Sequence, residues 1–77
     1  MSEYYFRETE DVFLAATLYA LGFDLRYMDA SRGKYYFGFS ATDEVIDAME
    51  KYPDGKVLVE PQKLFQSYGL LKLKMYE

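Results

Sequence analysis

The sequence predicts a small α+β domain in which an antiparallel β-hairpin packs against three α-helices, in the order α-β-β-α-(β)-α. Three segments place apolar residues at the 3.6-residue spacing of helices, and two segments between the first and second of these alternate apolar and polar residues, as half-buried strands do. The chain has 77 residues, nine Tyr, six Phe and no Cys. We therefore expect a single domain over residues 1–77, with a core built from aromatic side chains because no disulfide can stabilise it.

The first helix is predicted over residues 10–21. Thr9 is the expected N-cap, and Glu10 and Asp11 fall in the first turn, where the helix dipole favours negative charge. Apolar residues then recur at helical spacing. Gly22 follows them and is a typical residue to end a helix.

Two strands of a hairpin are predicted next, over residues 23–28 and 34–40, with a turn that ends at Gly33. Strict alternation divides each strand between two faces. The apolar face is predicted to hold Phe23, Leu25, Tyr27, Tyr35, Phe37 and Phe39. The outward face is predicted to hold Asp24, Arg26, Met28, Lys34, Tyr36, Gly38 and Ser40.

A second helix is expected after the hairpin, with Ser40 or Thr42 as its cap and the turn residues Pro53-Asp54-Gly55 at its end. The apolar run over residues 57–59 is a candidate third strand at the edge of the sheet. The N-terminal Tyr4-Tyr5-Phe6 could pair as an edge strand, pack over the first helix or be covered by a partner.

A third helix is predicted to begin at Pro61, since proline suits the first turn of a helix. Gly69 interrupts this helix at a cost of about 1 kcal/mol relative to alanine, so we expect close packing there. The periodicities of all elements together define an expected core. Its members are Phe13, Leu25, Phe37, Phe39, Ile46, Phe65 and Leu71.

The residue types that usually carry catalysis are scarce. The chain has neither His nor Cys, and so lacks the most common general base, the thiolate nucleophile and the usual zinc ligands. There is no glycine-rich phosphate loop, and Asp24, Asp29 and Asp54 do not lie in a twelve-residue calcium loop. Most carboxylates fall at caps or on solvated helix faces. We therefore expect no enzymatic activity, no metal and no cofactor.

The N-terminus has no basic segment followed by an apolar run, which argues against a signal peptide. The longest apolar stretch, Val12 to Leu21, is too short to span a bilayer. We expect a cytoplasmic protein without a membrane partner. Its net charge of −4 disfavours non-specific binding to nucleic acid.

Three surfaces are candidate binding sites. The first is the hairpin, where the basic residues Arg26, Arg32 and Lys34 are interleaved with strand aromatics such as Tyr36. Sheet modules stack single-stranded bases on faces of this kind. Basic residues of the third helix that could meet phosphates or an acidic partner are Lys63, Lys72 and Lys74. The acidic face of the first two helices could imitate the charge pattern of nucleic acid. The first two have ordinary explanations too, since one outward tyrosine is common and lysines suit a helix C-terminus.

The caps and apolar positions together resemble a family of short prokaryotic and phage domains of unknown function, typically under a hundred residues. The motifs that carry the resemblance are Thr9-Glu10-Asp11-Val12-Phe13-Leu14-Ala15-Ala16, Leu21-Gly22-Phe23, Tyr36-Phe37-Gly38-Phe39, Tyr52, Val59-Glu60-Pro61, Phe65 and Leu71-Lys72. The resemblance covers roughly residues 9–76, and the chain departs from the family pattern at Gly69. It implies a bacterial, archaeal or viral setting, often as a phage-borne accessory protein, and it transfers no activity and no functional residue.

These observations favour a non-enzymatic protein-interaction module, a phage or prokaryotic accessory protein that binds a host or viral protein. The alternative hypothesis is a weak binder of single-stranded nucleic acid that uses the outward face of the hairpin. A homodimer is a further expectation, because the aromatic content is high and residues 57–59 could form an exposed edge strand.

Overall fold

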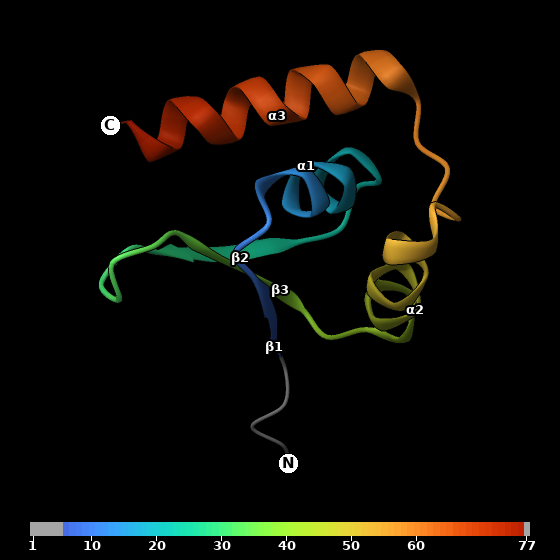
Figure 1. Ribbon diagram of the computed structural model, residues 1–77, viewed down its shortest axis with the longest axis horizontal. Coiled ribbons are helices and arrows are strands. Elements are labelled where there is room, and N and C mark those ends of the chain that lie inside the picture. The colour runs from blue at the N-terminus through green and yellow to red at the C-terminus, as the bar shows by residue number, and fades with distance from the viewer. Residues whose placement is uncertain (1–5, 77) are drawn as a thin grey trace.

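The computed structural model describes residues 6–76 and has an α+β architecture, as predicted (Figure 1). The elements are β1 (Phe6–Thr9), α1 (Val12–Ala20), β2 (Leu25–Asp29), β3 (Tyr36–Ser40), α2 (Asp43–Lys51), the 3₁₀ turn η1 (Tyr52–Asp54) and α3 (Pro61–Met75). The sheet, α1 and α3 lie one above the other, with α2 at one side (Figure 1). None of the helices within residues 6–76 is long and apolar enough to cross a membrane.

The sheet has three antiparallel strands in the order β1-β3-β2. The third strand is therefore contributed by the N-terminal segment, where Phe6 pairs with Ser40 and Thr9 with Phe37. The prediction of a strand at residues 57–59 is wrong, because this segment is the connection between η1 and α3. Of the suggested N-terminal strand, Phe6 is confirmed, and Tyr4 and Tyr5 lie outside the described residues.

An irregularity in β2 between Leu25 and Tyr27 changes which side chains face the core. Tyr27 is paired with Gly38, and Met28 is paired with the buried Phe37. Because paired residues share a face of the sheet, Met28 faces the core and Tyr27 faces outward. The predicted orientation of these two side chains is wrong, since strict alternation does not anticipate the extra residue of a bulge.

Helix α1 is the centre of the molecule, between the sheet and α3 (Figure 1). All five residues from Leu14 to Leu18 are buried, as expected of a helix that is apolar on every side. Its N-cap is Asp11, whose carboxylate accepts hydrogen bonds from the backbone N–H groups of Phe13 and Leu14 at 2.9 and 3.2 Å. The predicted cap, Thr9, instead ends β1 and accepts a bond from the N–H of Asp11 at 3.0 Å.

The expected core is correct in part. Phe37, Phe39 and Leu71 are fully buried, whereas Leu25 and Ile46 are only partly buried. Phe13 and Phe65 were placed in the core wrongly, because their side chains are 57% and 78% exposed. Apolar periodicity does not distinguish the inner from the outer side of a helix that has apolar residues on several sides.

The second half of the chain follows the predicted caps. Thr42 is the N-cap of α2, and its hydroxyl accepts a bond from the N–H of Val45 at 3.2 Å. Gly55 ends η1 with a φ of 71°, a backbone conformation that favours glycine. At its far end α3 is tied to the hairpin, because the hydroxyl of Tyr35 donates a hydrogen bond to the carbonyl of Met75.

Gly69 does not pack closely against anything, contrary to the sequence prediction. It is exposed in the middle of α3, and a Cβ added to it would have no neighbour within 4 Å. We therefore expect Gly69→Ala to raise the free energy of unfolding by about 0.5–1 kcal/mol, because alanine has the higher helix propensity. Urea denaturation at low micromolar concentration measures the change, and a loss of stability would contradict it.

Candidate interaction surfaces

The outward face of the sheet is a network of paired charges centred on Glu8 of β1. The Glu8 carboxylate accepts a hydrogen bond from the hydroxyl of Tyr27 at 2.5 Å and from Nη2 of Arg32 at 3.0 Å. The same guanidinium lies 3.2 Å from a carboxylate oxygen of Asp29. These contacts join the N-terminal strand to β2 and to the hairpin turn.

The hydrogen bonds of this network shift the pKa values of its members. The bond to Glu8 raises the pKa of Tyr27 to about 12. Hydrogen bonds from Tyr27 and then Arg32 lower the pKa of Glu8, and the bond to Glu8 raises the pKa of Arg32. Glu8 and Arg32 therefore remain charged and paired at neutral pH, while the Tyr27 hydroxyl keeps its proton.

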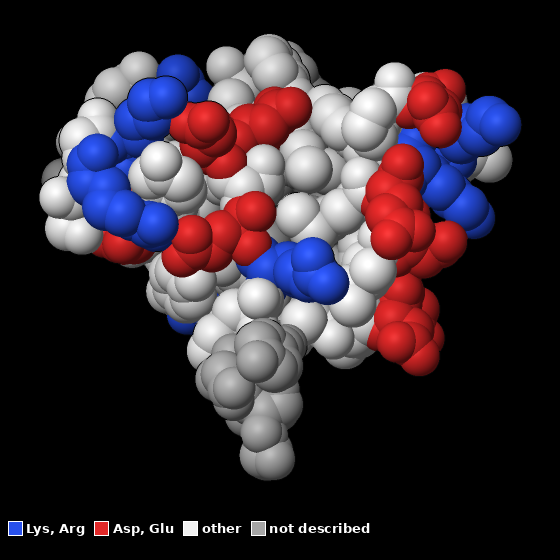
Figure 2. Space-filling view, turned by 60° about the horizontal axis from the view of Figure 1, so that its bottom comes forward, with Lys and Arg blue, Asp and Glu red and all other residues white. Residues whose placement is uncertain are grey.

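The predicted basic face of the hairpin is neutralised by these and similar pairs. Arg26 lies 3.5 Å from Asp24 and donates to the hydroxyl of Ser40 at 3.4 Å. Lys34 pairs with Glu10 at 3.0 Å. Four carboxylates pair with these three cations. They belong to Glu8, Glu10, Asp24 and Asp29. Figure 2 shows acidic and basic side chains interspersed over this part of the molecule.

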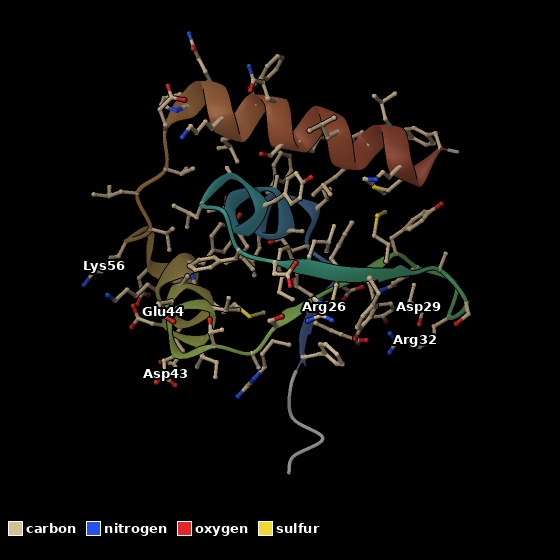
Figure 3. The ribbon with its side chains drawn as sticks, turned by 180° about the vertical axis from the view of Figure 1, so that it is seen from behind. Arg26, Asp29, Arg32, Asp43, Glu44 and Lys56 are labelled. Carbon is tan, nitrogen blue, oxygen red and sulfur yellow. The ribbon has the colours of Figure 1, made fainter. Side chains whose placement is uncertain are left out.

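Tyr36, the predicted stacking platform, is covered by a neighbour. The guanidinium carbon of Arg32 lies 3.8 Å from the centroid of the Tyr36 ring, in a cation–π contact. The structure thus brings Arg32 and Tyr36 together, whereas Arg26 lies away from them under the centre of the sheet (Figure 3). A nucleic-acid base could stack on Tyr36 only if Arg32 moved.

The three lysines of α3 do not form one patch. Lys63 lies in the first turn of the helix and Lys72 and Lys74 in the last, so Lys63 and Lys72 are separated by roughly 14 Å along the axis. The ammonium of Lys72 lies 5.8 and 5.1 Å from the ring centroids of Tyr68 and Tyr76. A hydrogen bond with Tyr76 raises the pKa of Lys72.

The acidic surface belongs to α2 rather than to both helices. Asp43 and Glu44 lie exposed in its first turn, and Figures 2 and 3 place acidic side chains along this side of the molecule. Asp47 pairs with Lys51 at 3.0 Å. The acidic residues next to α1 have other roles, because Asp11 caps the helix and Glu10 pairs with Lys34.

An apolar groove, which the sequence did not predict, lies where α1 meets the first half of α3. It has a volume of about 360 Å³ and is lined by Phe13, Pro61, Leu64, Phe65 and Tyr68. The rings of Phe13 and Tyr68 stack with centroids 5.0 Å apart and an angle of 3° between their planes. A second cavity of about 300 Å³ shares Phe13 and Leu64 and continues past Tyr52 and Val57.

A signal for this groove was present in the composition of α3. The helix has more large apolar residues than one buried stripe can hold, and Ser67 and Leu71 are its buried members. Phe65 and Leu73 lie off that stripe and are 78% and 65% exposed. Contiguous apolar surface that a small domain leaves exposed is a candidate interaction site.

The fold and its surfaces thus define a small α+β domain with an exposed apolar groove, and within residues 6–76 no group of three acidic side chains could hold a metal ion. The chain belongs to a family described as a domain of unknown function, DUF5659, whose model matches residues 2–76. This confirms the resemblance to a family of unknown function. Comparisons with curated proteins and with solved structures found no match.

Proposed function

We propose that this domain is a non-enzymatic protein-interaction module, a cytoplasmic accessory protein of a phage or prokaryote that binds a host or viral protein through the groove between α1 and α3. The observation that carries the proposal is the groove itself, whose lining is apolar and includes the exposed ring of Phe13. The partner that fits it is a protein segment that offers an aromatic or aliphatic side chain.

The dimensions of the groove suit this kind of contact. A volume of about 360 Å³ is in the range of ligand sites and accommodates one large side chain. Phe13 and Tyr68 present stacked, rigid rings, and aromatic residues in desolvated pockets provide most of the energy of protein interfaces. A few such contacts would suffice for a specific but modest affinity.

The charge distribution supports a protein partner over single-stranded nucleic acid. The hairpin cations Arg26, Arg32 and Lys34 already have carboxylate partners, so a phosphate would have to compete for them. The net charge of the chain is −4. This charge repels a polyanion at separations shorter than the screening length of the salt.

We expect a peptide chosen from a displayed random library, with the whole chain as bait, to lose affinity on the order of thirtyfold when Phe13 is replaced by serine. Removal of one central side chain of an interface costs about 2 kcal/mol of binding free energy, which corresponds to this loss of affinity. Fluorescence titration of the peptide into each variant measures it. The matched control is Leu58→Ser, since Leu58 is 88% exposed and lies outside the groove.

Two outcomes would contradict the proposal. One is a selected peptide that binds Phe13→Ser as tightly as it binds the original chain. The other is saturable micromolar binding of mixed-sequence single strands at about 50 mM salt that Tyr36→Ala abolishes, which would make the hairpin face the functional surface. We expect no saturable binding of oligonucleotides.

A further inference from the structure

The exposed side of α3 has an internal symmetry that the groove does not explain. Gly69 lies one residue from the middle of the helix and makes no contact that requires a glycine. Phe65 and Leu73 lie four residues before and after it, and Gln62 and Tyr76 lie seven residues before and after it. At 3.6 residues per turn, all four fall within about 40° of Gly69 around the helix axis.

This stripe is largely apolar, and at one end the ammonium of Lys72 lies 5.1 Å from the ring centroid of Tyr76. Phe65, Leu73 and Tyr76 are 78%, 65% and 75% exposed, and Gln62 is exposed and uncharged. The stripe therefore has large apolar side chains on both sides of Gly69, where no side chain projects. Glycine is unfavourable in the interior of a helix. The close approach of another backbone would explain a glycine at this position.

We propose that the occupant of this stripe is a second copy of the chain, whose α3 packs antiparallel across a two-fold axis at Gly69. In this arrangement Gly69 meets Gly69 of the second copy, as the self-complementary interface of a two-fold dimer requires. Phe65 meets Leu73 of the second copy, and Gln62 meets its Tyr76. Each large side chain of the stripe thus contacts a side chain of the second copy.

The helix dipoles, more than the charges, favour the antiparallel arrangement. The helix contains no acidic residue and carries Lys72 and Lys74 in its last turn. A parallel pair would bring these four lysines to one end of the interface, whereas the antiparallel pair places two of them at each end, where Lys63 of the second copy also lies. The antiparallel pair also opposes the two helix dipoles favourably.

The available area predicts a weak dimer. The two aromatic side chains and one leucine of each copy bury roughly 800–1,200 Å² in total, which is at the low end of specific interfaces. The proposal goes beyond the groove and does not rest on it, because Phe13 lies outside the stripe. Phe65 borders both surfaces, so it is not used to separate them.

The test is sedimentation equilibrium of the whole chain from about 10 μM to 1 mM, a range that covers weak association. We expect the mass to rise from that of one chain, 9.1 kDa, towards twice that value. Gly69→Glu and Gly69→Lys should each raise the dissociation constant at least tenfold, because a two-fold axis places like charges together. An equimolar mixture of the two variants should associate again, since it pairs opposite charges.

Leu70→Glu is the control. Leu70 is 47% exposed but points about 100° away from Gly69 around the helix, so this variant should dimerise like the original chain. A constant mass of one chain over the whole range would overturn the proposal. So would Gly69→Glu that dimerises as well as the original chain, a mixture that fails to associate, or Leu70→Glu that fails to dimerise. Circular dichroism of each variant confirms that it is folded.

Discussion

Replacing Phe37 by alanine is expected to lower the free energy of unfolding by about 3–5 kcal/mol. Phe37 lies on the central strand β3, opposite Thr9 and Met28, and its side chain is fully buried in the same core cluster as Leu18 of α1. Removal of the ring leaves a cavity that a small core has little freedom to fill. Because domains of this size are only marginally stable, the variant should be largely unfolded at 25 °C, as urea denaturation and circular dichroism would measure.

The matched control is the same substitution at Phe65, which the sequence placed in the same core and the structure places 78% exposed. Phe65→Ala should change the free energy of unfolding by less than about 0.5 kcal/mol when measured at low micromolar concentration, where association contributes little. If the two variants lost equal stability, the assignment of inner and outer faces would be wrong.

Replacing Gly38 by valine is expected to cost about 1–3 kcal/mol. Gly38 is buried on β3, and a Cβ at this position would overlap the ring of Tyr27. That ring is held in place by its hydrogen bond to Glu8 at 2.5 Å and by an edge-to-face contact with Phe6, with centroids 5.6 Å apart. The new side chain has to displace the ring and break both contacts.

A double-mutant cycle gives this prediction its control. In a Tyr27→Ala background the space above Gly38 is open, so Gly38→Val should cost much less there than in the original chain. Urea denaturation of the four proteins measures the coupling. An equal cost in both backgrounds would show that the penalty comes from the backbone of β3 rather than from the Tyr27 ring.

The candidate surfaces were predictable as residue types but not as sites. Arg26, Arg32 and Lys34 were identified as basic residues of the hairpin, and they do belong to it or to its turn. Their carboxylate partners were not identified, because Glu8 reaches Arg32 only after β1 has paired with β3, across 24 positions of sequence. The groove was missed for a related reason: it is formed by α1 and α3 together, and neither helix alone defines it.

The elements whose signals are local can be predicted from the sequence. The cap at Thr42, the stop at Gly55 and the start of α3 at Pro61 each depend on hydrogen bonds or backbone angles within a few residues. The hairpin was likewise evident, with strand ends that differ from the prediction by one or two residues. Alternation and turn chemistry are properties of the chain before it folds.

Which sides of these elements are buried depends on how the elements pack against one another. The pairing of β1 beside β3, the bulge that turns Tyr27 outward and the exposure of Phe13 and Phe65 all depend on contacts between distant segments. Helix α1 is apolar on every side, and α3 has more apolar residues than one face can cover. Such patterns fit several packings equally well, and the choice among them is made by the shape and volume of the neighbouring elements.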